Sequence, residues 1–220
     1  MNKNLPVNNF FLLVILSAIW GSAFFAIKIG LNSFSPTAVA SLRLIIASIF
    51  LLFFFYIQKK KIIFTCQNLF LLLIIGIVGN FIPFYLISWA EQYIPSSTAG
   101  MLMAIGPIIT LLMSHYLTKN EKFSFIKLIS VLVGLVGVLF IFNFNSFNNF
   151  FEFSYFDIIA KLLVIIAAFG YMFSNILAYE KLSHIDSFSI TTFATTFGAI
   201  FSIPFLIVDI TLNSSILRLD

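Results

Sequence analysis

The feature that most constrains this chain is a series of seven almost entirely apolar stretches, each close to the length of a bilayer-spanning helix. They lie at 9–30, 37–57, 69–90, 96–117, 124–142, 157–179 and 187–208. A helix needs about 20 mostly apolar residues to cross the hydrocarbon core of a bilayer. The segments between the stretches are too short for a soluble domain, and the alternating pattern of a membrane β-barrel is absent. The sequence therefore predicts an all-α, polytopic membrane helix bundle with seven transmembrane helices.

Composition supports the same class and excludes several others. Hydrophobic residues make up 61% of the 220 residues and charged residues 9%, against about 25% charged in an ordinary soluble protein. A soluble enzyme, a disordered chain and a nucleic-acid-binding domain are therefore excluded, and the lipid bilayer is the expected partner. Cys66 is the only cysteine, so an intrachain disulfide and a cysteine metal cluster are excluded as well.

The distribution of Lys and Arg predicts the orientation of the chain. With the N-terminus in the cytoplasm, eight basic residues of the loops and helix ends fall on the inner side and three on the outer side. Short cytoplasmic loops of membrane proteins carry the excess of Lys and Arg. We therefore expect a multi-pass protein of the cell inner (plasma) membrane with a cytoplasmic N-terminus.

Charged residues inside the apolar stretches are the first candidates for function. Arg43 lies six residues into the second stretch, which is about 9 Å deep at 1.5 Å per residue. A cation at that depth costs at least about 2–3 kcal/mol unless it meets water or a partner. Lys28 lies close enough to its helix end for the ammonium to snorkel to the interface.

One carboxylate, Glu91, is expected on the same side of the bilayer as these cations and is a further candidate for the substrate path. Lys28, Arg43 and Lys161 then outnumber it, which leaves positive charge uncompensated. That excess is suited to receive a carboxylate or phosphate of a substrate. Water and lipid headgroups could equally balance this excess positive charge, and both interpretations stay open.

The third stretch offers three further polar candidates around Pro83. A proline inside a helix frees a carbonyl group and kinks the helix. Such a kink either sets the shape of the bundle or forms a hinge or cavity wall, as in transporters with a midplane site. Asn80, Tyr85 and Trp89 lie on the same helix and are candidates for lining a substrate path. Trp89 is equally suited to be an interfacial anchor.

A stripe of small residues runs along the first stretch. Ala18, Ser22, Ala26 and Gly30 are each four residues apart and therefore share one helix face. Small residues let helix backbones approach closely in lipid. We expect this face to pack against another helix, with a path-lining role as the alternative.

Motifs of catalysis and metal binding are absent from the sequence. Neither His115 nor His184 has a second ligand at metal spacing, and no zinc, nucleophile-elbow or phosphate-loop pattern occurs. We therefore expect no catalytic residue, no metal and no cofactor.

Several short motifs follow one another between residues 10 and 142. They are W-G-S-A-F-F-A-I-K at 20–28, Ser35-Pro36, A-S-L-R at 40–43, A-E-Q-Y-I-P-S-S-T-A-G at 90–100, Gly106-Pro107, N-E-K at 120–122 and G-L-V-G-V at 134–138. Their order and spacing resemble the EamA family of the drug/metabolite transporter superfamily. The match of each single motif is weak, and their combination is the signal.

The resemblance implies ten helices in two five-helix repeats that insert with opposite orientations. Residues 9–142 would form the first EamA-like repeat, and residues 157–220 a partial second repeat of two helices. At an offset of 151 residues, Trp20 falls on Tyr171 and Phe50 on Phe201. Lys28 and Arg43 fall on an uncharged tyrosine and alanine, so the second repeat lacks both cations.

The resemblance also implies a function. It is the transport, with export expected, of small metabolites such as amino acids by alternating access, without enzyme activity. Arg43 and then Lys28 are the charged groups expected near the path. The expected partners are the bilayer, a small-molecule metabolite, and either a second copy or a missing C-terminal half. Two alternatives stay open: a truncated, inactive or partner-dependent membrane protein without transport of its own, and an integral-membrane enzyme.

Overall fold

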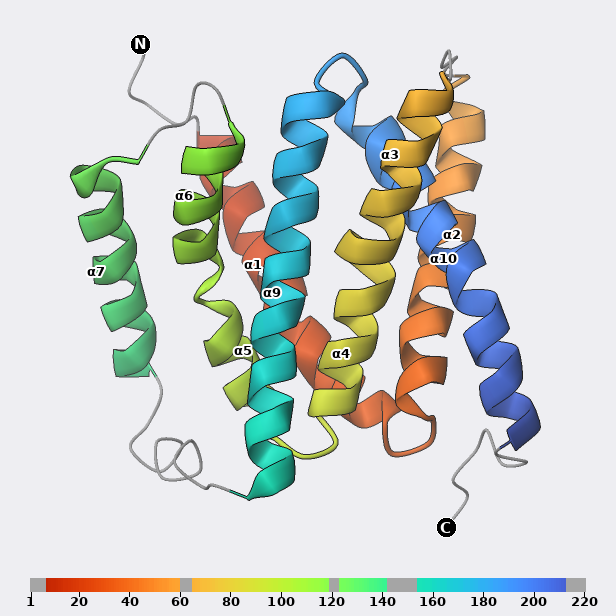
Figure 1. Cartoon of the computed structure of the whole chain (residues 1–220), viewed down its shortest axis with the longest axis horizontal. Helices are drawn as coiled ribbons and strands as arrows, with labels where there is room; N and C mark the ends of the chain where they lie inside the picture. The colour runs from red at the N-terminus through yellow and green to blue at the C-terminus, as the bar shows by residue number, and fades with distance from the viewer. Residues whose placement is uncertain (1–6, 60–64, 119–122, 142–153, 213–220) are drawn as a thin grey trace.

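The computed structural model describes residues 7–59, 65–118, 123–141 and 154–212. Every regular element in these ranges is helical, and the helices run side by side as a bundle (Figure 1). They are α1 (Val7–Gly30), α2 (Pro36–Ile57), α3 (Cys66–Gly76), the π-helical turn η1 (Ile77–Phe81), α4 (Ile82–Ala90), α5 (Ser96–Met103), α6 (Gly106–Leu117), α7 (Phe125–Ile141), α9 (Tyr155–Lys181) and α10 (Ser187–Leu212). The expected all-α helix bundle is therefore confirmed.

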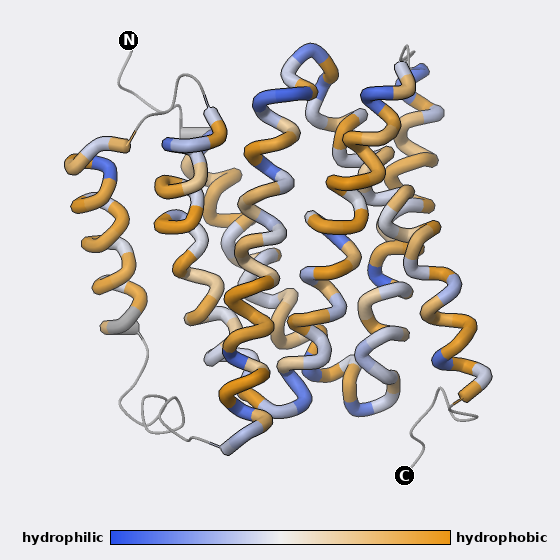
Figure 2. The backbone as a smooth tube through the Cα atoms, in the orientation of Figure 1, coloured by the Kyte–Doolittle hydropathy of each residue, from blue (hydrophilic) through white to orange (hydrophobic). Residues whose placement is uncertain are grey.

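Six helical segments are long and apolar enough to cross a membrane, judged by length and composition. They are Asn9–Gly30, Pro36–Ile57, Cys66–Ala90, Ser96–Leu117, Tyr155–Lys181 and Ser187–Leu212. The helix in the fifth expected stretch, α7, is shorter, with 17 residues. Figure 2 shows apolar residues along the length of the helices and hydrophilic ones gathered toward the two ends of the bundle. This distribution is the one that a polytopic membrane protein requires, because its middle faces hydrocarbon.

The third expected helix contains a π-helical turn immediately before Pro83. Proline has no N–H group for the preceding turn and interrupts the α-helical hydrogen-bond ladder. The N–H of Ile82 instead donates to the carbonyl oxygen of Ile77, five residues earlier. Helix α4 then carries Pro83 in its first turn. The irregularity expected at Pro83 is thus a single π-helical turn, after which the α3–η1–α4 segment continues in the same direction.

The fourth expected helix is divided into α5 and α6. The break lies at Ala104 and Ile105, and Pro107 occupies the first turn of α6. A proline is well tolerated in the first turn of a helix, where backbone N–H groups lack intrahelical partners. Pro204, by contrast, lies inside the continuous helix α10.

Glycines allow the central helices to approach at backbone distance. Helix α10 packs along α2 and α3, and α9 packs along α4 and α6. A Cβ atom on Gly198 would lie 2.7 Å from the carbonyl oxygen of Gly76, and one on Gly170 would lie 2.6 Å from that of Val78. These contacts need residues without side chains, as close helix packing in membranes generally does. They place the α3–η1–α4 segment between α9 and α10.

Most of the packing stripe expected on the first helix is uncovered among the described residues. Helix α1 is exposed from Asn9 to Ser22, and Ala18, Ser22 and Ala26 are all exposed. The helix contacts chiefly α5, its buried part begins near Ile27, and Gly30 packs against Val39 of α2. The expectation of packing is therefore wrong for the first three residues within the described chain, because no second helix covers them there. The 120–122 motif and residues 213–220 of the expected second repeat lie outside the described residues.

Candidate functional site

Charged side chains from three helices gather at one end of the bundle. We call it the Glu91 end; α1 and α4 finish there, and α2, α5 and α9 begin there (Figure 1). Lys28 lies in the last turn of α1, Arg43 two turns into α2, and Glu91 immediately after α4. We refer to Lys28, Arg43 and Glu91 as the charged cluster. Each of the three is a residue expected from the sequence to lie near a substrate path.

Lys28 is tied to the backbone of the turn between α4 and α5. Its ammonium Nζ donates to the carbonyl oxygen of Glu91 and lies 3.4 Å from that of Ile94. Both acceptors are main-chain atoms at the end of α4, where carbonyl groups lack partners within the helix. Lys28 therefore fastens α1 to the α4–α5 turn through the protein backbone.

Glu91 is completely buried, with 0% of its surface exposed. Its Oε2 accepts a hydrogen bond from Ser96 Oγ at 3.2 Å, and its Oε1 has no hydrogen-bond partner among the described residues. Glu91 lies one residue beyond the apolar span. Burial disfavours the charged carboxylate and raises the pKa of Glu91 to about 7, against the opposing effects of Ser96, Lys28 and Arg43. The carboxyl group is therefore poised to exchange a proton near neutral pH.

Arg43 lies against aromatic rings instead of a carboxylate. Its guanidinium carbon is 4.4 Å from the centroid of the Phe84 ring, a cation–π geometry. The Phe84 ring lies 6.1 Å from that of Tyr171 on α9. Arg43 Nη1 is buried and has no hydrogen-bond partner within the described chain. The charges of Arg43 and Glu91 attract each other, yet the two side chains form no ion pair in the described structure.

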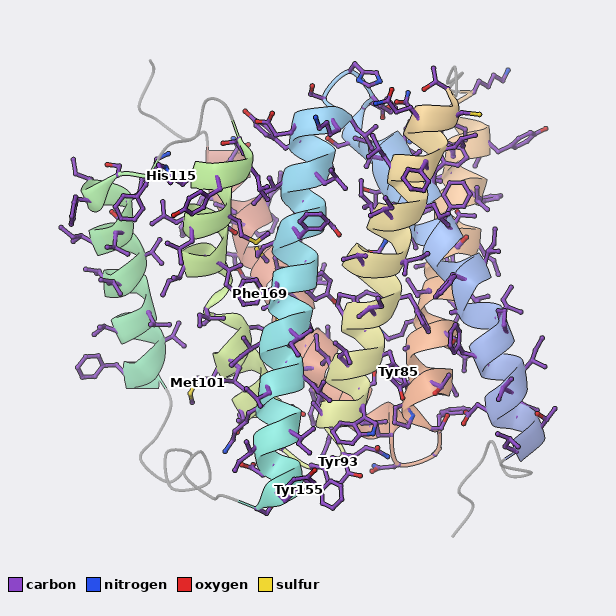
Figure 3. The ribbon with its side chains drawn as sticks, in the orientation of Figure 1. Tyr85, Tyr93, Met101, His115, Tyr155 and Phe169 are labelled. Atoms are coloured by element: carbon purple, nitrogen blue, oxygen red, sulfur yellow. The ribbon has the colours of Figure 1, made fainter. Side chains whose placement is uncertain are left out.

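Tyr85 belongs to a separate groove. The groove has a volume of about 520 Å³ and lies between α2, the η1–α4 segment and α10. Its lining consists of Thr37, Phe81, Tyr85, Pro204, Phe205, Val208, Asp209 and Leu212. Asp209 accepts a hydrogen bond from Ser35 Oγ, which joins the end of α10 to the start of α2. Tyr85 therefore points into a largely aromatic and apolar groove, and Figure 3 shows it on the same half of the bundle as Tyr93 and Tyr155.

Asn80 and Trp89 lie in packed surroundings apart from the charged cluster. Asn80 is partly buried in η1, where its Cβ is 3.5 Å from the position that a Cβ on Gly198 would take. The Trp89 ring packs on that of Tyr93, with 4.7 Å between the centroids, and the Tyr93 ring stacks on Phe156 at 5.1 Å. This aromatic group at the Glu91 end fits the interfacial anchor that the sequence left open for Trp89.

Four residues of these sites were missed by the sequence analysis as functional candidates. They are Phe84, Ser96, Tyr171 and Asp209, which contact or flank the candidates through the tertiary fold. The one available signal was the 151-residue offset that aligned Tyr171 with Trp20. No local pattern predicts that Phe84 lies under Arg43, because the two residues belong to different helices.

Among the described residues, no three His, Cys, Asp or Glu side chains are grouped so that they could hold a metal ion. His115 Nδ1 accepts from the backbone N–H of Phe123 at 3.2 Å, and His184 Nε2 lies 3.2 Å from the amide nitrogen of Asn68. Figure 3 shows His115 at the end of the bundle opposite Tyr93. Both histidines thus make polar contacts away from the charged cluster.

Comparison with known families matches residues 9–143 to a model described as the EamA-like transporter family. The match covers more than half of the chain and contains the charged cluster. It agrees with the resemblance carried by the short motifs. No solved structure matches this chain.

Individual relatives are proteins described as transporters. The chain is 31% identical over 121 residues to an uncharacterized transporter in the trpA 3'region of Buchnera aphidicola subsp. Schlechtendalia chinensis, which covers 55% of this chain and 40% of that protein. It is 24% identical over 193 residues to the uncharacterized transporter YoaV of Bacillus subtilis, covering 88% of this chain and 64% of that one. A probable terminal-alkyne amino-acid exporter of Streptantibioticus cattleyicolor is 28% identical over 102 residues, with 46% and 34% covered. The chain thus spans less than two thirds of the length of each of these relatives.

Proposed function

This chain belongs to the EamA-like transporter family, and from that premise we propose that it carries a small metabolite across the cell inner membrane by alternating access. The observation that carries the proposal is Arg43, a cation inside a membrane-spanning helix whose Nη1 is buried and lacks a hydrogen-bond partner among the described residues. An ionisable group in such a position is costly and usually marks a substrate or ion pathway. A substrate carboxylate would satisfy it.

The proposed substrates are amino acids or related compounds, and the proposed direction is export. A carboxylate is, with phosphate, one of the two groups whose geometry matches the planar guanidinium of Arg43. The name of the Streptantibioticus cattleyicolor relative, a probable amino-acid exporter, agrees with this class and direction. The scarcity of catalytic groupings in the sequence agrees with transport without chemical conversion of the substrate.

The proposed orientation places the N-terminus in the cytoplasm and the Glu91 end on the outer face of the inner membrane. It is supported by the excess of Lys and Arg on the side predicted to be cytoplasmic. In this orientation the charged cluster lies toward the outer surface, and the chain alternates between states that open the cluster to either side.

A second candidate is a chain that depends on a partner for transport. The observation favouring it is the exposure of α1 from Asn9 to Ser22, with its face of small residues uncovered. Small-residue faces support close helix association in lipid. A second copy of this chain or a separate polypeptide supplying further helices would fit that face, and both are proposals.

Reconstitution of the 220-residue chain in liposomes tests the proposed function. We expect vesicles loaded with labelled amino acids to release at least one of them faster than protein-free vesicles do. The Arg43→Ala variant, reconstituted at equal density, is the matched control and should release label at the protein-free rate. Release equal to the protein-free rate by the unaltered chain would contradict independent transport. Recovery of release on co-reconstitution with a cross-linkable partner would support the second candidate.

A further inference from the structure

Two buried atoms of opposite formal charge are left without hydrogen-bond partners at the Glu91 end. They are Arg43 Nη1 on α2 and Glu91 Oε1 after α4. Buried polar atoms are satisfied in the great majority of cases, and leaving a charged one unsatisfied is costly. Within the described chain neither atom is satisfied by the other, although their charges attract. A ligand that bonds to both atoms would therefore satisfy them together.

Lys28 acts on the Glu91 carboxylate through its charge but makes no hydrogen bond to it. Its ammonium donates to the main-chain oxygen of Glu91 and approaches that of Ile94, and neither contact reaches the carboxylate. Ser96 supplies one hydrogen bond to Oε2 and leaves Oε1 unused. A further donor is needed to satisfy the carboxylate.

An apolar cluster supplied by four helices lies within one helical turn of each of the two residues. Ile27 of α1, Val39 of α2, Ile87 of α4 and Ala167 of α9 form one buried cluster, against which Tyr171 also packs. Val39 lies one turn from Arg43, and Ile87 one turn from Glu91. Charges interact more strongly where the surroundings are apolar than they do in water. A ligand with two charges would therefore be held strongly between Arg43 and Glu91.

We propose that Arg43 and Glu91 together bind a zwitterionic amino carboxylate, with Arg43 taking the substrate carboxylate and Glu91 the substrate ammonium. This inference rests on the proposed function and deepens it by naming the group that each side chain recognises. A simple anion would satisfy Arg43 and leave Glu91 unpaired, whereas a simple cation would do the reverse. Only a ligand with both charges satisfies both atoms, and unsatisfied groups are what make such a site selective.

A proton and the substrate ammonium compete for Glu91 in this site. Without substrate, Glu91 holds a proton on its carboxyl group below about pH 7, because burial raises its pKa to about 7. When the ammonium binds to the protonated form, the carboxyl group releases that proton to the solvent and pairs with the ammonium as the carboxylate. Proton release therefore approaches one per ammonium below about pH 7 and falls above it. By linkage, the affinity for the zwitterion rises as the pH rises through about 7.

The other titratable and charged groups near Glu91 are already engaged or lie on α9. The charged groups that act on Glu91 from other helices are Lys28 of α1 and Arg43 of α2. On α9, Tyr171 interacts with Arg43, and the charged residues of its first turns are Asp157 and Lys161. Asp157 and Lys161 form an ion pair at 2.5 Å, one turn apart on α9. Their charges offset each other, so Glu91 remains the acid available to a ligand. Because Glu91 has no exposed surface, the structure holds the site closed, and binding requires an opening of the Glu91 end.

Ligand-dependent thermal stabilisation of the purified full chain tests this site. The probes are the twenty common amino acids, each with its N-acetyl form and its decarboxylated amine, at about pH 6 and about pH 8. We expect at least one amino acid to bind and both of its relatives to bind at least about tenfold more weakly. We expect tighter binding of that amino acid at the higher pH.

Variants of Glu91 separate the proposal from a structural role of this residue. Glu91→Gln preserves the acceptor for Ser96 but should abolish the pH dependence of binding and remove the preference over the N-acetyl form. Glu91→Asp should retain the pH dependence with weaker binding, and it provides the test if the first variant does not fold. Glu180→Gln, in the last turn of α9 at the opposite end, is the matched control and should behave as the unaltered chain.

Three results would overturn the proposal: no binding by any amino acid, equal binding of an amino acid and its N-acetyl form, or unaltered pH dependence in Glu91→Gln. These are distinct from failure of the proposed function. Binding of a zwitterion without transport would contradict the proposed function and leave this site in place. Transport of an anion that lacks an amino group, at a rate unaffected by Glu91→Gln, would support the proposed function and contradict this site.

Discussion

The guanidinium of Arg43 lies over the ring of Phe84, with 4.4 Å between the guanidinium carbon and the ring centroid. This contact joins α2 to α4 and supplies a favourable face for a cation inside a membrane-spanning helix. It orients the planar group while leaving Nη1 without a hydrogen-bond partner among the described residues. The cation is thus held in place by an aromatic ring, and its hydrogen-bonding capacity remains available to a ligand.

Replacing Arg43 tests whether this capacity serves transport. Arg43→Ala should abolish transport in the liposome assay, because it removes the cation that receives the carboxylate. Arg43→Lys should retain part of it, since an ammonium lacks the planar fork of donors. Membrane abundance, measured by immunoblotting, should be unchanged in both. Full transport by Arg43→Ala would remove this residue from the path.

The contact between α3 and α10 depends on the absence of a side chain at Gly198. A Cβ there would lie 2.7 Å from the carbonyl oxygen of Gly76, which is backbone and cannot move aside cheaply. Gly198→Ala should therefore destabilise the protein by about 1–3 kcal/mol, as overpacking does. Gly134→Ala is the matched control, because its Cβ would meet no other described atom within 4 Å apart from the neighbouring backbone of its own helix. Thermal unfolding in detergent should show a lower melting temperature for the first variant alone.

Ser35 combines two hydrogen bonds at the start of α2. Its Oγ accepts from the N–H of Ala38 as the helix N-cap and donates to Asp209 of α10. Loss of an N-cap hydroxyl typically costs about 1 kcal/mol, and Ser35→Ala also removes the link to α10. Ser17→Ala is the control, because that hydroxyl is exposed and bonds only to the Leu13 carbonyl of its own helix. Equal melting temperatures for the two variants would contradict a structural role of the Ser35–Asp209 contact.

Burial of Glu91 predicts how the stability of the protein depends on pH. Its pKa is raised from 4.5 to about 7 in the folded chain, so the folded state binds the proton more tightly than the unfolded state. The resulting stabilisation is fully present below about pH 4.5 and is lost as the pH rises through about 7. The melting temperature of the unaltered chain should fall over this range more than that of Glu91→Gln. Parallel curves for the two proteins would show that Glu91 is not buried in this way.

The orientation in the membrane can be tested with the native cysteine. Cys66 is exposed at the start of α3, at the end of the bundle opposite Glu91. An impermeant thiol reagent should label it only after the inner membrane is permeabilised. In a Cys66→Ala background, a cysteine placed at position 146 by Ser146→Cys, outside the described residues, should be labelled without permeabilisation. The reverse pattern would overturn the proposed N-terminal side.

Six of the seven expected spans, and the helical character of all seven, were predictable because each depends on local sequence. Apolar stretches of bilayer length specify spans, and the Ser35-Pro36 pair specifies an N-cap with proline in the first turn, as found at α2. Proline positions predicted irregularity but not its form, since Pro83 follows a π turn and Pro107 a break. The small-residue face of α1 predicted packing that the described chain provides only at Gly30.

The sequence by itself determined that this protein lies in lipid, where its helices are, and which charged residues are candidates for a substrate path. Hydropathy and charge act residue by residue along the chain. The sequence could not determine which candidates meet. Only the tertiary structure directed Lys28 to main-chain oxygens and placed Phe84 under Arg43. It also placed Tyr85 apart from them, in the groove with Asp209. These contacts join residues of different helices, and their geometry is decided by how the helices pack in space. The physical reason is that burial, which leaves Arg43 and Glu91 unsatisfied, is a property of packing and not of sequence spacing.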